Sequence, residues 1–220
     1  MKARLDESTI ALRAAREFPD GAVVNLGYGM PGLCANLVPG GRAVYFQSEN
    51  GMLGYGNLAA DEAKDYEMIN ASDQPVVALP GMCFFDSAAS FDMIRGGHID
   101  IVVLGAYQVS EKGDLANWGR PGRPATGMGG GMDLAVGAKR VIVTMLHTTK
   151  KGEPRVVKRC TYPITARHCV SLIVTDLAVI EVTGEGLVLR EIAPGWTPAE
   201  VQDLTEARLM PADDLTEVTL

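Results

Sequence analysis

Short apolar runs recur along the chain and alternate with segments in which apolar residues follow a helical spacing. Continuous apolar runs of this length are typical of strands that are buried on both faces of a parallel sheet. The runs predict strands at residues 22–26, 43–46, 75–79, 101–106 and 141–146, followed by a hairpin of residues 172–182 and 186–191. Helical spacing and cap residues predict helices at residues 6–18, 33–38 and 85–95, and a last helix that begins at Thr197.

This alternation also predicts the fold class. Strands separated by helices favour a parallel sheet with helices packed on its faces. We therefore expect residues 1–220 to form one α/β domain with a mainly parallel central sheet flanked by helices. Asp6 or Ser8 is expected to cap the first helix, and the turn of the hairpin is expected at residues 183–186.

Glycine is concentrated in two segments. Residues 27–32 lie between a predicted strand and a predicted helix, an arrangement that directs free backbone N–H groups at an anion. Residues 119–131 are too rich in glycine for us to expect a helix there. This second segment is either a flexible surface loop or a backbone that approaches a ligand so closely that a Cβ atom would clash.

Composition argues against several classes of function. The net charge is −7 and no long Lys/Arg cluster occurs, so nucleic acid is not expected as a partner. No window approaches the ~18 apolar residues of a membrane span, and the first residues contain no apolar segment of a signal peptide. The four cysteines show neither C-x-x-C spacing nor a Cys/His cluster, which predicts a cytoplasmic protein without a metal site.

A single carboxylate stands out at the end of the predicted strand 43–46. Glu49 is bracketed by small polar residues and Gly51. Ligands of open α/β sheets bind where strands give way to loops at their carboxyl ends. Glu49 could therefore be a general base, a metal ligand or a nucleophile, and the alternative is a solvated loop residue.

Other polar residues give weaker signals. His98 follows the predicted helix 85–95 and is expected to satisfy carbonyl groups at its end, and His147 and His168 are expected to be structural. The basic residues within 150–159 form either a phosphate-binding patch or a solvated hairpin or subunit edge.

Several motifs together resemble one protein family. The blocks that carry the resemblance are V-N-L-G-Y-G-M-P at 24–31, Q-S-E-N-G at 47–51, M-I-R-G-G-H at 93–98, L-A-N-W at 115–118, G-M-G-G-G-M-D at 127–133 and V-T-D-L-A at 174–178. Their order and their extent, from about residue 20 to about residue 205, resemble the β subunit of the 3-oxoacid coenzyme A (CoA) transferases.

The resemblance implies a mechanism and site residues. It implies that Glu49 is the nucleophile, that it forms a glutamyl-CoA thioester in a ping-pong reaction, and that CoA is a substrate rather than a permanently bound cofactor. We expect oxyanion and CoA contacts from the backbone of four glycines, Gly27, Gly29, Gly129 and Gly130. Ser48, Asn50 and Gly51 are expected to support the site, either by orienting the carboxylate or by turning the end of the strand.

The resemblance also implies a partner and a substrate class. The family pairs this subunit with an α subunit, usually as α2β2, so the isolated chain is expected to be inactive. CoA would move between an acyl-CoA, such as succinyl-CoA or acetyl-CoA, and a carboxylic acid, such as acetoacetate, 3-oxoadipate or butyrate. The chain departs from the family at residues 57–60, which lack the usual proline, and at Gly32, where Thr is common, so the acyl group stays open.

Three alternatives to the transferase remain open at this point. An acyl-CoA hydrolase would result if water reached the glutamyl thioester. A sugar-phosphate isomerase would share the architecture without the S-E-N-G block, because fold does not fix chemistry. A catalytically silent subunit would only stabilise its partner.

Overall fold

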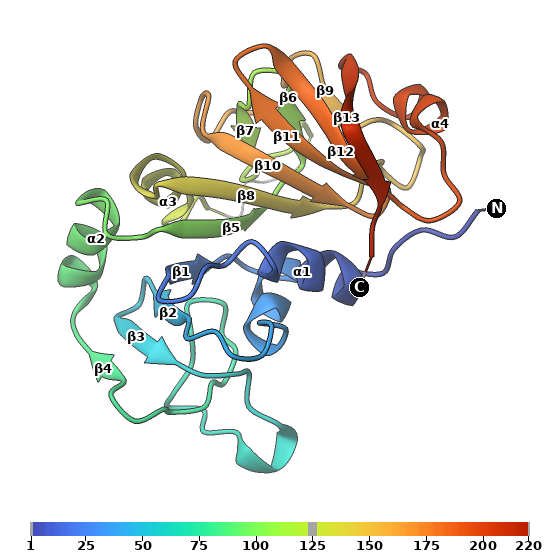
Figure 1. Cartoon of the computed structure of the whole chain (residues 1–220). Helices are drawn as coiled ribbons and strands as arrows, with labels where there is room; N and C mark the ends of the chain where they lie inside the picture. Colours follow the sequence, from blue (N-terminus) through green and yellow to red (C-terminus); the bar gives the residue numbers. More distant parts are fainter. Residues whose placement is uncertain (1, 123–126, 220) are drawn as a thin grey trace.

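One large sheet runs through the molecule (Figure 1). In the computed structural model, which describes residues 2–122 and 127–219, this sheet has ten strands in the order β13-β12-β11-β10-β8-β5-β1-β2-β3-β4. Its centre consists of five strands that pair with one another in parallel. These are β10 (Val170–Thr175), β8 (Arg140–Met145), β5 (Ile101–Gly105), β1 (Val23–Leu26) and β2 (Tyr45–Ser48). The predicted single-domain α/β fold with a mainly parallel sheet is confirmed.

Antiparallel strands extend the sheet on both sides. On one side the hairpin of β11 (Ala178–Thr183) and β12 (Gly186–Ile192) follows β10, and β13 (Leu209–Glu217) lies parallel to β12. On the other side are β3 (Met52–Tyr55) and β4 (Cys83–Phe84). A second, three-stranded sheet contains β7 (Leu115–Ala116), β6 (Gln108–Ser110) and β9 (Val156–Val157).

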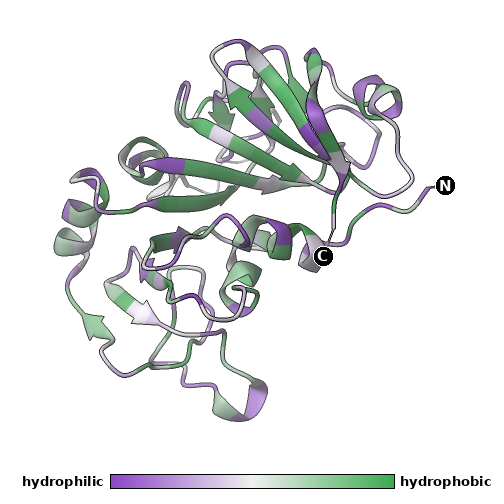
Figure 2. Ribbon diagram, viewed as in Figure 1, coloured by the Kyte–Doolittle hydropathy of each residue, from purple (hydrophilic) through white to green (hydrophobic). Residues whose placement is uncertain are grey.

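Two hydrophobic cores cover the two faces of the large sheet. One core contains residues of α1 (Glu7–Ala15) and of the 3-10 helix η1 (Met30–Asn36). The other contains residues of α2 (Ser87–Arg95), α3 (Gly131–Gly137) and α4 (Pro198–Asp203). Successive residues of β5 alternate between the two cores, which explains the continuous apolar run in the sequence and the hydrophobic centre of Figure 2.

Helix ends agree with the chemistry of their cap residues. The Asp6 side chain accepts a hydrogen bond from Thr9 N–H and caps α1. At α4, Thr197 and Glu200 form a capping box with a proline in the first turn. A short 3-10 helix, η2 (Asp61–Ala63), lies in the polar segment after β3.

Three predicted elements differ from the structure. Residues 75–79 form only isolated bridges, because Pro75 and Pro80 lack donors and Val77 and Leu79 are exposed. The run 172–182 is broken into β10 and β11 by a turn, since Thr175 Oγ1 accepts hydrogen bonds from the N–H groups of the second and third residues that follow it. The predicted helix 33–38 is instead η1, which begins at Met30, next to a glycine and a proline.

The glycine-rich segment leads into a helix that the sequence did not predict. The structure does not describe residues 123–126 of this segment, but α3 begins at Gly131. Leu134 and Ala135 of α3 are buried in the same core as residues of α2 and β5. Tertiary packing thus stabilises the helix despite its low intrinsic propensity.

The order of the parallel strands positions the site. Numbered along the chain, the five central strands follow the order 2-1-3-4-5 from β2 to β10. The direction of the connections therefore reverses between β1 and β5. In open α/β sheets, the crevice outside the carboxyl ends of the strands at such a switch point is the usual ligand site.

Candidate active site

A cavity of about 400 Å³ lies at this switch point. Its walls come from the carboxyl ends of β1 and β5, from the residue after β2 and from the loop before α3. Glu49 is the residue after β2, and residues 127–131 form the loop. The strand order thus brings two motifs together that are about 80 residues apart in the chain.

The carboxylate of Glu49 lies against the glycine backbone of this loop. A Cβ atom at Gly130 would overlap Glu49 Oε2 and would lie 2.8 Å from Cδ, and a Cβ atom at Gly129 would lie 3.9 Å from Oε1. Gly130 has an ordinary backbone conformation, whereas Gly129 has a φ of +52°. Glycine at position 130 is therefore explained by the close approach of the carboxylate and not by a turn.

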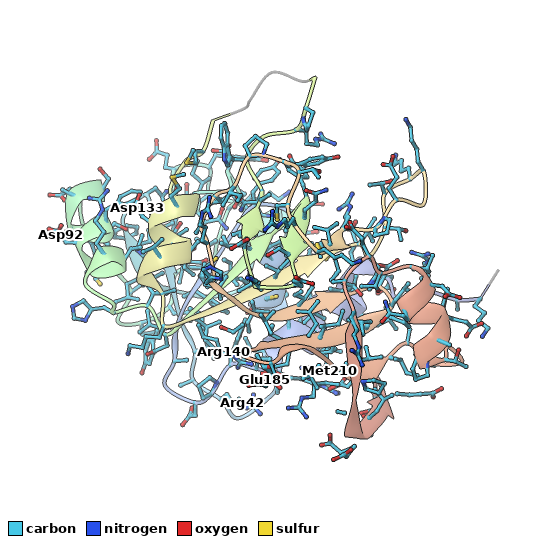
Figure 3. All side chains as sticks on the ribbon, turned by 90° about the horizontal axis from the view of Figure 1, so that it is seen from above. Arg42, Asp92, Asp133, Arg140, Glu185 and Met210 are labelled. Atoms are coloured by element: carbon cyan, nitrogen blue, oxygen red, sulfur yellow. The ribbon has the colours of Figure 1, made fainter. Side chains whose placement is uncertain are left out.

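Burial changes the acidity of Glu49. The carboxylate is half-buried, and this burial raises its pKa above the ordinary value. The N–H of Gly130 opposes the rise by hydrogen bonding, and the charge of Asp133 adds to it. Asp133 lies on α3 next to α2 (Figure 3) and pairs with Arg95 at 2.7 Å. A poorly hydrated carboxylate is a stronger nucleophile than one fully solvated by water.

A chain of buried hydrogen bonds fixes the strand that carries Glu49. Asn25 Nδ2 donates to Gln47 Oε1 at 2.6 Å, and Gln47 Nε2 donates to Ser90 Oγ at 2.7 Å. Ser90 Oγ in turn donates to the carbonyl oxygen of Ser48 at 3.2 Å. The chain ties β1, β2 and α2 together at the residues that precede Glu49, so the position of the carboxylate is set by three elements.

The three expected supporting residues have structural contacts. Gly51 has a φ of +113°, and a Cβ atom there would overlap the carbonyl oxygen of Phe85. Ser48 Oγ accepts a hydrogen bond from Ala71 N–H at 2.8 Å, and Asn50 Nδ2 donates to the Ile69 carbonyl at 2.8 Å. Within residues 2–122 and 127–219, no hydrogen bond joins the Ser48 or Asn50 side chain to the Glu49 carboxylate. Both side chains instead hold the neighbouring loop.

The two glycines after β1 differ from each other. Gly27 lines the cavity, but its N–H donates to the Val103 carbonyl at 2.8 Å and is not free for an oxyanion. Gly29 adopts φ +82° and ψ −129°, which only glycine adopts readily, and it is the cap residue before η1 and does not line this cavity. Of the four expected glycines, Gly129 and Gly130 lie beside Glu49.

Sequence reasoning missed several residues around the site. Asn25 and Ser90 are polar residues in apolar surroundings, and that contrast was the available signal. Asn117 was part of a recognised motif without an assigned role, and it lines the cavity with its Oδ1 fixed by Thr165 Oγ1 at 2.7 Å.

The histidines take no part in the cavity. His147 is fully buried, and its ring nitrogens bind Thr175 and Thr205 at 2.9 and 2.8 Å, as a structural residue would. The His98 N–H donates to the Met93 carbonyl at the end of α2. His168 is exposed, with its ring beside the Lys112 carbonyl.

Two absences concern the described part of the chain. In residues 2–122 and 127–219, no three His, Cys, Asp or Glu side chains lie close enough to hold a metal ion. No helix in these ranges is both long enough and apolar enough to cross a bilayer.

A family model and two relatives of similar length identify the family of this chain. A family model described as Coenzyme A transferase matches residues 8–204. One subunit of a probable succinyl-CoA:3-ketoacid coenzyme A transferase of Bacillus subtilis is 49% identical over 195 residues, or 89% of this chain and 90% of the relative. One subunit of a 3-oxoadipate CoA-transferase of Pseudomonas putida is 50% identical over 210 residues, or 94% of this chain and 97% of the relative.

A solved structure supports the fold independently. The apoenzyme of an acyl-CoA transferase from Escherichia coli O157:H7 superposes with a TM-score of 0.74 at 21% identity. The match covers 98% of this chain but 44% of that longer chain. At this identity the likeness concerns the architecture alone.

Proposed function

Because the chain belongs to the coenzyme A transferase family, we propose that it is the β subunit of an enzyme that moves CoA between an acyl-CoA and a carboxylic acid, with Glu49 as its nucleophile. One observation carries the proposal. The Glu49 carboxylate is half-buried in the switch-point cavity, and Gly130 approaches it too closely for any side chain at that position.

The reaction conserves the thioester bond through two exchanges at Glu49. A carboxylate oxygen of Glu49 attacks the acyl-CoA carbonyl, the C–S bond breaks, and the thiolate leaves with the electron pair. The thiolate then attacks the Glu49 carbonyl of the mixed anhydride and expels the acyl group as a carboxylate. The resulting glutamyl-CoA thioester is attacked by the acceptor carboxylate, and the two steps run in reverse.

The neighbouring backbone supports these steps. Each attack places negative charge on an oxygen beside Glu49, where the Gly130 N–H is a donor from the loop before α3. The burial that raises the pKa of Glu49 also keeps its carboxylate poorly solvated before attack. Exclusion of water is equally important, since water would hydrolyse either intermediate.

The names of the relatives support a substrate class and a partner. Their names refer to succinyl-CoA with 3-ketoacids and to 3-oxoadipate. We assign this chain a 3-oxoacid or short-chain carboxylate acceptor, such as acetoacetate, 3-oxoadipate or butyrate, and succinyl-CoA or acetyl-CoA as donor. Because each of those relatives is one subunit of a transferase, we expect an α subunit as the partner, in an α2β2 assembly.

Mass spectrometry tests the proposal directly. The chain, copurified with its α subunit, is incubated with several acyl-CoAs in the absence of an acceptor acid. We expect a CoA adduct on the peptide that contains Glu49, none in Glu49→Gln, and a loss of turnover of at least about 10⁴-fold in that variant. Glu67→Gln, at an exposed position after η2, is the matched control and should form the adduct normally.

Other outcomes would replace the proposal. Accumulation of free CoA without an adduct would indicate a hydrolase. The absence of both adduct and free CoA with every donor, while the two subunits remain associated, would indicate a chain that only stabilises its partner.

A further inference from the structure

A second cavity lies beside the Glu49 cavity at the same edge of the sheet. It has a volume of about 470 Å³ and extends from the end of β1 across β5 to the end of β8. The two cavities share four lining residues, Gly27, Tyr28, Leu104 and Asn117. The second cavity is therefore directly adjacent to the place where a substrate would react at Glu49.

A buried hydroxyl group in this second cavity has no partner. Thr144 in β8 is 1% exposed, and its Oγ1 makes no hydrogen bond within residues 2–122 and 127–219. Thr144 is one of the residues that line the cavity. Buried polar groups are almost always satisfied in native proteins, so an unpaired hydroxyl in a residue beside a cavity indicates a missing partner.

A cation lines the same cavity without a counterion. Arg155 is half-buried, and no hydrogen bond or ion pair of its guanidinium occurs in the described ranges. The nearby Asp176 is already held by Arg4 at 2.9 Å and by the His147 N–H. Burial, and next the charge of Arg120, lower the pKa of Arg155, so an anion there would relieve an unfavourable environment.

A third donor lies on the wall between the two cavities. Because Asn117 Oδ1 accepts from Thr165 Oγ1, the Asn117 amide is oriented with Nδ2 as its unused donor. Glu7 is the acid among the lining residues, and it is exposed to solvent at the start of α1. The cavity thus presents three donors without acceptors, one of them charged.

We propose that Asn117, Thr144 and Arg155 form an anion subsite that binds a carboxylate or phosphate group of the substrate remote from the reacting carbonyl. A guanidinium together with amide N–H and hydroxyl donors of the same cavity suits the acceptor-only oxygens of such a group. β8 is three strands away from β2, a span of about 14 Å. The subsite rests on the proposed transfer reaction in one respect only, which is the identity of the molecule that carries the anionic group.

Two sources of the anion can be distinguished by direct binding. Calorimetry on the chain copurified with its α subunit would use four probes, which are glutarate, butyrate, CoA and pantetheine. If the subsite holds the distal carboxylate of the acyl group, Arg155→Gln weakens glutarate at least about tenfold and leaves butyrate and CoA unchanged. If it holds a phosphate, the same variant weakens CoA at least about tenfold and leaves pantetheine unchanged.

A second variant and a control make the test robust to misfolding. Thr144→Val has the same shape and removes only the hydroxyl, so it should weaken the same probe several-fold. Arg159→Gln, an exposed arginine four residues away, should change no probe. Binding of all four probes within about twofold of wild type in both Arg155→Gln and Thr144→Val would overturn the subsite.

Failure of the transfer reaction would be seen separately. In a Glu49→Gln background, Arg155→Gln should weaken the affected probe by the same factor as in wild type, because the subsite residues are intact. A chain that forms no thioester but still binds glutarate or CoA through Arg155 would retain the subsite and lose the transferase proposal.

Discussion

Two polar clusters lie at the carboxyl end of β8, and they differ in how completely their hydrogen bonds are made. In the His147 cluster, both ring nitrogens bind threonine hydroxyls, and the N–H binds Asp176, which also pairs with Arg4. Three residues earlier, the Thr144 hydroxyl is equally buried and has no partner among the described residues. The same strand thus ends in a satisfied cluster and an unsatisfied one.

The difference separates two uses of buried polarity. A fully bonded cluster contributes to the stability and uniqueness of the fold. An unbonded donor reduces stability, and it is tolerated where a ligand supplies the missing acceptor. The Glu49 cavity also contains an incompletely bonded polar group, because its carboxylate is desolvated by burial and contacts few donors.

Protonation of His147 should break the satisfied cluster. Burial lowers the His147 pKa from 6.5 to about 4, so between these values the unfolded chain binds a proton that the folded chain does not. Stability should be constant above pH 6.5 and fall by about 3 kcal/mol as the pH falls to about 4. Denaturant titrations at several pH values measure this loss.

Two variants isolate the contribution of His147 to this loss. His147→Gln should lose most of the slope, while His98→Gln, at an exposed position, should keep it. An unchanged slope in His147→Gln would assign the acid sensitivity to other groups.

A methyl group at position 130 should disturb the reactive cavity. Gly130→Ala places its Cβ atom on Glu49 Oε2 and displaces the carboxylate, so turnover should fall by roughly 10²-fold, equivalent to between 2 and 3 kcal/mol. Steady-state kinetics of the copurified complex measure the effect. Gly184→Ala is the control, because no atom lies within 4 Å of its added Cβ atom.

A double variant tests the cause of that loss. Gly130→Ala should also lower the free energy of unfolding, and the decrease should largely disappear in a Glu49→Ala background, where the overlapping side chain is gone. Equal destabilisation in both backgrounds would mean that Gly130 is required for another reason, such as its contact with Phe91.

Removal of the unpaired Thr144 hydroxyl should give a small gain in the free energy of unfolding, which would sharpen the contrast with the His147 cluster. Thr144→Val should raise the free energy of unfolding by about 1 kcal/mol, since it removes a buried group without a partner and suits a central strand. Thr175→Val should have the opposite sign, because Thr175 Oγ1 binds His147 and three backbone groups. Destabilisation of the folded chain by Thr144→Val would show that its hydroxyl already has a partner.

Local patterns were sufficient for the parts of the fold that depend on local chemistry. Asp6 and Thr197 cap the helices as expected, and the continuous apolar run of β5 is buried on both faces. The apolar run of residues 43–46 also predicts that Glu49 lies at the end of a strand, which is β2. A short apolar run is enough for this, because burial and chain direction are encoded within a few residues.

The remainder depends on contacts between distant residues. Thr144 belongs to an apolar run that predicts only a strand, and nothing nearby indicates that its hydroxyl is unpaired. The link from Gln47 to Ser90 joins residues 43 positions apart. Residues 75–79 have the composition of a strand, but prolines and exposure limit their pairing to isolated bridges. Periodicity reports local burial and contains no information on these pairings.

The docking of the amino-terminal helix has a consequence for synthesis on the ribosome. Arg13 in α1 binds Glu191 through two of its nitrogens, across a separation of 178 residues, and Leu5 N–H donates to the Asp176 carbonyl. At ordinary translation rates this partner emerges roughly 10 to 40 s after the helix. The apolar face of α1 must wait for that time without its final contacts. A nascent chain of this kind is a natural client for chaperones that bind exposed helices, and its folding should be completed only near the end of translation.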